Sequence, residues 1–81
     1  MAMTLDELST GTAARISKVD WPALAEDEAK RLRALGIDEG AEVTIAHRGI
    51  LLGRDPLAIR IGRMTVAVRR SHARVIAVET A

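Results

Sequence analysis

Residues 30–45 read KRLRALGIDEGAEVTI, and this stretch predicts a helix end, a tight reversal and the start of a strand. Leu32 and Leu35 lie three positions apart, the spacing of one helical face. Gly36 stands where a helix commonly ends, because its left-handed closing residue is best supplied by glycine, which has no Cβ. Ile37 would then fold back onto Leu32, as an apolar residue often does after such a cap. The stretch determines how one helix leans on a sheet.

The strand that follows is predicted from alternation. Gly40 supplies a second flexible backbone joint before it. Apolar Val43 and Ile45 alternate with polar Glu42 and Thr44, which is the period of a half-buried strand. We therefore expect a strand over residues 41–47.

The composition is that of one small aliphatic domain. The 81 residues are 48% hydrophobic, but Trp21 is the one aromatic residue. A domain of this size buries only about 60–65% of its unfolded surface. The absence of cysteine excludes disulfides, thiolate catalysis and cysteine-ligated metal sites. The N-terminal residues resemble no signal peptide, and no apolar run approaches the roughly 20 residues of a membrane span, so we expect a cytoplasmic protein without membrane insertion.

Charge is distributed unevenly along the chain. Residues 1–40 carry five basic and eight acidic side chains, whereas residues 41–81 carry seven basic and three acidic ones. A basic half can indicate an acidic partner or nucleic acid. We favour arginines that solvate the outer face of a sheet, because proteins that bind single-stranded nucleic acid usually stack bases on surface aromatic residues, which this half does not contain.

The first half predicts a helical turn, a strand and the main helix. Thr4 and Glu7 have the spacing of a capping box, so a short turn is expected over residues 4–8. A first strand is expected over residues 12–19. Asp20 can cap the main helix, with Pro22 in its first turn. Trp21 is interpreted as a core residue or a lid at the start of the helix, with an exposed partner anchor as the alternative.

Two i,i+4 ion pairs are expected on that helix. Glu26 precedes Lys30 and Asp27 precedes Arg31, the polarity that suits the helix dipole.

The second half contains the clearest hairpin of the sequence. Residues 57–61 and 64–68 flank the two-residue loop Gly62-Arg63, with glycine first, as a type II′ turn requires. This register pairs Ile61 with Met64, which places the apolar residues of both strands on one face. Ser71 can then cap a single helical turn through residue 74, and residues 75–78 form the last strand.

Five strands, with one helix between the first and second, predict a small antiparallel β-barrel. Closure would also remove exposed sheet edges, which suits so short a chain.

The chain resembles the FeoA family of bacterial ferrous iron transport accessory proteins over nearly its whole length. The first half matches the pattern "RL…LGL.PG..V.V", and the second half matches "GDP..I.V.G…LR.SEA..I.V". The residues that carry the second match are Gly53, Asp55-Pro56, Ile59, Ile61-Gly62, Val68-Arg69, Ser71, Ala73 and Ile76. Three positions depart from the pattern: Glu39 stands where proline is common, Arg54 is inserted before Asp55, and His72 replaces a common glutamate.

This resemblance implies an SH3-like barrel that acts through FeoB, the membrane ferrous-iron transporter with a GTP-binding domain. The SH3 mode of binding proline-rich peptides needs an aromatic-lined groove, and the chain has no Phe or Tyr. A detached sensing module, like the SH3-like domain of iron-dependent repressors, is a further alternative.

The segment that follows the strand predicted over residues 41–47 offers a docking hypothesis. Three adjacent apolar residues lie between glycines, and not all of them can easily turn inward. The alternative is that they cap one mouth of the barrel. The predicted docking residues are Ile50, Leu51, Leu52, Arg54, Asp55 and Pro56.

Catalysis and cofactor binding are not expected. Ser71 and His72 are adjacent, which points their side chains apart rather than into a nucleophile–base pair. No glycine-rich phosphate loop precedes a helix, so direct nucleotide binding is not expected. Ferrous iron prefers histidine with carboxylate ligands, but neither His47 nor His72 has an acid at ligand spacing on its own element. Transition-metal ion binding, if it occurs, would be weak and would use one of these two histidines.

Overall fold

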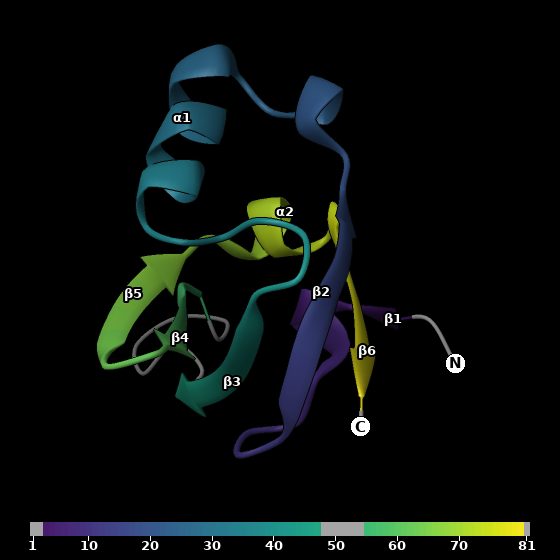
Figure 1. Cartoon of the computed structure of the whole chain (residues 1–81), viewed down its shortest axis with the longest axis vertical. Helices are drawn as coiled ribbons and strands as arrows, with labels where there is room; N and C mark the ends of the chain where they lie inside the picture. The colour runs from purple at the N-terminus through teal and green to yellow at the C-terminus, as the bar shows by residue number, and fades with distance from the viewer. Residues whose placement is uncertain (1–2, 48–54, 81) are drawn as a thin grey trace.

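A computed structural model describes residues 3–47 and 55–80. Six strands form one antiparallel sheet in the order β1-β6-β2-β3-β4-β5, and the main helix α1 lies at one end of it (Figure 1). In chain order the elements are β1 (Met3–Thr4), the 3-10 helix η1 (Leu5–Glu7), β2 (Ala13–Val19), the 3-10 helix η2 (Trp21–Ala23), α1 (Glu26–Ala34), β3 (Glu42–His47), β4 (Leu57–Ile61), β5 (Met64–Val68), α2 (Arg70–Ala73) and β6 (Ile76–Thr80).

The sheet is strongly bent but open. Within the described residues, β1 and β5 lie at its two edges and do not pair with each other. The predicted small antiparallel β architecture with one main helix is present, but the sheet does not close into a full barrel. The prediction of five strands was wrong, because Met3 and Thr4 pair with Val78 and Ala77 as a sixth strand. A strand of two residues is too short to show the alternation of apolar and polar side chains, so only the pairing with β6 identifies it.

The reversal after α1 has the predicted geometry. Gly36 adopts a φ of 97°. The amide of Ile37 donates to the carbonyl of Leu32 at 3.0 Å, and the amide of Gly36 donates to that of Arg33 at 3.0 Å. These two bonds make the Schellman motif that closes a helix through a left-handed residue. Leu32 and Ile37 are both fully buried, so the cap also anchors α1 to the core.

The predicted start of the main helix was wrong. Asp20 is followed by the 3-10 helix η2, and its side chain makes no capping hydrogen bond. Leu24 and Ala25 are extended, with ψ values of 148° and 146°, and α1 begins only at Glu26. Trp21 and Leu24, on either side of this short turn, are half-buried and pack against the core.

One of the two expected ion pairs on α1 is present. Lys30 Nζ lies 3.6 Å from Glu26 Oε1. Arg31 was expected to pair with Asp27 but binds Glu28 instead, through both its Nε and its Nη2. Positions three apart are neighbours on a helix as much as positions four apart, so the sequence offers both partners.

The hairpin prediction is confirmed in every pair. Ile61 pairs with Met64 and the register continues without a bulge to Leu57 and Val68. Gly62 has a φ of 59°, as the first position of a type II′ turn requires.

The core consists of aliphatic side chains from one face of the bent sheet, from the helical segments and from the loops beside them. Half-buried residues, Trp21 among them, surround it. Trp21 also lies beneath the guanidinium of Arg33, whose Cζ is 4.0 Å from the ring centroid. The buried residues are Leu5, Leu8, Ala14, Ile16, Val19, Leu32, Ile37, Val43, Ile45, Leu57, Ile59, Val66, Val68, Ala73, Ile76 and Val78.

The loop between α1 and β3 is tied to β2 by a side chain. Glu39 Oε2 accepts a hydrogen bond of 3.0 Å from the amide of Val19. Gly40 and Ala41 exchange bonds of 2.8 Å with the backbone of Ile16. A glutamate at position 39 therefore holds this loop in place by a contact that the proline common in the family pattern could not make.

Candidate functional site

The predicted docking segment ends at the start of α2. Residues 48–54, which include Ile50, Leu51, Leu52 and Arg54, lie outside the described residues. Asp55 and Pro56 are described, and both are exposed. Asp55 Oδ1 accepts a hydrogen bond of 2.8 Å from the amide of Arg70, the first residue of α2.

This contact corrects the prediction that Ser71 caps the short helix. Arg69 is the N-cap residue, no side-chain cap comes from it, and Ser71 lies inside the helix. The carboxylate of Asp55 instead satisfies one of the amides that a helix start leaves unpaired. No sequence pattern indicates this bond, because the two residues are fifteen positions apart. The end of the docking segment is thereby attached to a fixed element of the fold.

A charged cluster joins α1 to α2. His72 Nδ1 of α2 lies 3.5 Å from Glu28 Oε1 of α1, which is longer than an ordinary hydrogen bond. The same oxygen accepts the bonds from Arg31. The Arg31 guanidinium holds the pKa of the Glu28 carboxyl below its ordinary value of 4.5, and the positive charges of His72 and Arg69 act in the same direction against partial desolvation.

Glu28 supplies the acid that His72 lacks on its own element. Sequence reasoning missed this pairing, because residues on two different helices meet only through the fold. The cluster does not make a metal site: among the residues described, no three His, Cys, Asp or Glu side chains are close enough to hold an ion. The guanidinium of Arg31 on the same carboxylate also opposes a bound cation.

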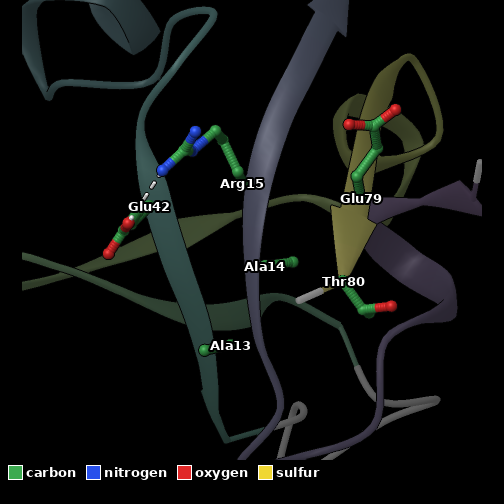
Figure 2. A pocket seen from close by; sticks show the side chains of 6 residues that line it. All are labelled: Ala13, Ala14, Arg15, Glu42, Glu79 and Thr80. Atoms are coloured by element: carbon green, nitrogen blue, oxygen red, sulfur yellow. Dashed lines mark hydrogen bonds and ion pairs between the residues drawn. The ribbon is translucent and has the colours of Figure 1, made fainter.

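A shallow hollow of about 350 Å³ lies over β2, β3 and β6. Figure 2 shows Arg15 extending toward Glu42 and away from Glu79. Arg15 Nη2 lies 3.3 Å from Glu42 Oε1, and both side chains are mostly exposed, so this ion pair is worth at most about 1 kcal/mol. Ala13, Ala14, Glu79 and Thr80 complete the lining, and we assign no chemistry to the hollow.

The described helices include none with the length and the apolar character that crossing a membrane requires.

Comparisons with known proteins identify the fold and the family. The sequence profile of the FeoA domain matches residues 3–80. No curated protein matches the chain significantly. Iron(II) transport protein A from Clostridium thermocellum is 28% identical with a TM-score of 0.84, and the match covers 98% of this chain but 46% of that protein, so this chain spans less than half its length.

Two further structures are informative. FeoA from Stenotrophomonas maltophilia, a prokaryotic SH3 domain protein complexed with zinc, is 35% identical with a TM-score of 0.78, over 95% of this chain and 89% of that one. IdeR from T. acidophilum has a TM-score of 0.81 at 18% identity, over 99% of this chain and 34% of that one, and shares the fold alone. The SH3-like fold is therefore confirmed, in an open form. Since the family profile spans all but the ends of the sequence, the chain belongs to the FeoA domain family.

Proposed function

We propose that this protein is a non-enzymatic accessory factor of bacterial ferrous iron uptake, which acts by binding the cytoplasmic part of a FeoB-type transporter. The observation that supports the proposal is the FeoA profile match over residues 3–80. Relatives with structures are named for iron(II) transport and for activation of ferrous iron transport. The described side chains add no arrangement of nucleophile and base that would suggest a reaction.

The docking surface is proposed to be the segment that contains Ile50, Leu51, Leu52, Arg54, Asp55 and Pro56. The bond from Asp55 to α2 supports this choice, because it anchors one end of the segment on the folded domain. A segment with a fixed end loses less conformational freedom when it binds, which favours affinity.

Co-purification with the transporter tests the proposal. Detergent-solubilised FeoB carrying an affinity tag is loaded with GTP or GDP and incubated with this protein. We expect retention of the wild type in at least one nucleotide state. The double variant Leu51→Ser, Leu52→Ser should reduce retention at least about tenfold, since burial of two leucines in an interface stabilises it by about 1.5–3 kcal/mol each.

The matched control is Ala34→Ser, which changes an exposed apolar residue on α1 outside the segment. It should be retained like the wild type. Retention of the double variant at the wild-type level would exclude the segment as the docking surface. Failure of the wild type to bind FeoB in either nucleotide state would contradict the proposed function itself. Loss of folding in the double variant, seen by circular dichroism, would instead favour the alternative that these leucines cap the barrel mouth.

Metal binding is tested separately. Equilibrium dialysis against ferrous iron under anaerobic conditions, with the double variant His47→Ala, His72→Ala as comparison, measures whether the histidines bind the ion. Stoichiometric micromolar binding that is lost in the variant would show that the protein handles iron directly and does not act by contact with the transporter alone.

A further inference from the structure

Strand β5 is an exposed edge of the sheet. Within the described part of the chain, β4 is its one hydrogen-bonded neighbour, and Figure 1 shows β5 on the outside of the sheet. The other edge, β1, has two residues, whereas β5 has five. A regular strand of this length with a free side is a template for a further strand.

The turn geometry decides which backbone groups face outward. A hydrogen-bonded pair, Ile61 with Met64, closes the two-residue turn. Because hydrogen-bonded and non-bonded pairs alternate, the amides and carbonyls of Thr65 and Ala67 point away from β4. None of the hydrogen bonds found among the described residues uses these four groups.

The devices that usually protect an edge are absent from β5. The strand contains no proline, no lysine and no bulge. Thr65 and Ala67 are exposed and too small to screen the backbone. Met64 at the end of the strand is 49% exposed, and it is the large apolar side chain that the described part of the chain leaves most open.

The surroundings of this edge are strongly basic. Residues 57–70 include four arginines and no acidic residue. Arg63 and Arg69 flank β5 at its two ends, six positions apart, which is roughly 20 Å in an extended chain. Glu28 lies near enough for the charge of Arg69 to lower its pKa, but Glu28 is already bound by Arg31. Within residues 3–47 and 55–80, the edge therefore presents backbone groups without partners between two cations.

Charge argues against a second copy of this chain as the added strand. Symmetric antiparallel pairing that satisfies all four outward groups would place Thr65 opposite Ala67 of the other copy. The same register sets Arg63 opposite Arg69, and like charges directly opposite each other destabilise a strand pair. A partner strand with carboxylates opposite Arg63 and Arg69 would instead form two favourable ion pairs in this register.

We propose that β5 binds an extended, acidic segment of a partner protein by strand addition, with Arg63 and Arg69 selecting carboxylates near the two ends of that segment. Backbone bonds to Thr65 and Ala67 supply the pairing, as in other proteins that extend a sheet with a bound peptide. The residues proposed for strand addition differ from those of the proposed docking segment at residues 50–56, so separate variants test the two proposals.

Synthetic peptides test the proposal on the full chain. The probe alternates threonine and valine between two glutamates placed six positions apart, and the control peptide has lysine in place of both glutamates. Titrations at low salt are followed by amide NMR of the labelled protein. The glutamate peptide should bind about tenfold more tightly than the lysine peptide. It should slow hydrogen exchange at the amides of Thr65 and Ala67, which purely electrostatic contact would not do.

Two variants separate the backbone and charge contributions. Ala67→Pro removes an outward amide, which an edge strand tolerates, and should abolish binding of the glutamate peptide. The double variant Arg63→Glu, Arg69→Glu keeps the edge and should reverse the preference, so that the lysine peptide binds more tightly. This second variant keeps the test valid if the proline variant fails to fold.

Four results would overturn the proposal. The first is equal affinity for the two peptides. The second is binding without protection of the Thr65 and Ala67 amides. The third is self-association of the wild-type chain through the same two amides, which would make a second copy the occupant. If neither peptide binds at millimolar concentration, the arginines protect the edge and do not select a partner.

Discussion

Replacement of Gly36 by alanine should destabilise the fold through backbone conformation alone. The φ of 97° at this position lies in the left-handed region, which L-residues rarely adopt. A Cβ built at Gly36 would meet Ile61 Cγ2 at 3.4 Å, which is ordinary van der Waals contact. Space is therefore available for the methyl group, and the cost comes from the dihedral angle.

The magnitude follows from two opposing effects. Holding an L-residue in the left-handed region costs about 1–2 kcal/mol. The smaller conformational entropy of alanine in the unfolded chain offsets about 0.4–1 kcal/mol of this. The net loss for Gly36→Ala is about 1 kcal/mol, which for a domain of this size lowers Tm by roughly 4–8 °C.

Urea denaturation and thermal melting of Gly36→Ala and Gly36→Asn measure this effect. Asparagine tolerates the left-handed conformation better than alanine, so it should lose less than half as much stability. An alanine variant as stable as the wild type would refute the reasoning. Equal losses for alanine and asparagine would show that contact with Ile61, and not the dihedral angle, determines the cost.

Three further predictions concern the core and the charged contacts. Leu32→Ala should lower the free energy of unfolding by about 2–5 kcal/mol in urea denaturation, because Leu32 is fully buried in the core. A loss below about 1 kcal/mol would mean that the surrounding side chains collapse into the space that the smaller residue leaves. Asp55→Ala should cost about 0.5–2 kcal/mol, because the amide of Arg70 loses its partner, and unchanged stability would show that water replaces the carboxylate. Arg31 depresses the pKa of the Glu28 carboxyl. The stability that this carboxylate contributes should therefore be present above about pH 4.5 and be lost as the pH falls through its lower folded-state pKa. Glu28→Gln should flatten that part of the curve of unfolding free energy against pH, and parallel curves for the wild type and the variant would contradict the assignment.

Local signals in the sequence predicted much of this fold. The hairpin register and the Schellman motif were both recognised, because each depends on residues within a few positions of one another. Gly62 and Gly36 supply the backbone angles that these turns require. The burial of Val43 and Ile45 followed from side-chain alternation, which is a property of any strand with one buried face.

The errors lie where local preference is ambiguous. Asp20 and Pro22 are good residues for a helix start, but the chain forms a 3-10 turn there, continues through an extended Leu24 that packs on the core, and begins its main helix only afterwards. Ser71 is a good cap by type, but its place inside α2 follows from the position at which β5 ends. In both cases tertiary contacts override a propensity that is worth only about 1 kcal/mol.

The sequence by itself determined the turns, the strand periodicity and the family resemblance, because dihedral preference and side-chain alternation act over short distances along the chain. The tertiary structure alone decided the open edge at β5, the bond from Asp55 to α2 and the approach of His72 to Glu28. These contacts join residues far apart in the sequence, and their formation depends on how the bent sheet brings its elements together. The surface proposed for strand addition belongs to this second group, whereas the proposed docking segment was predicted from the sequence.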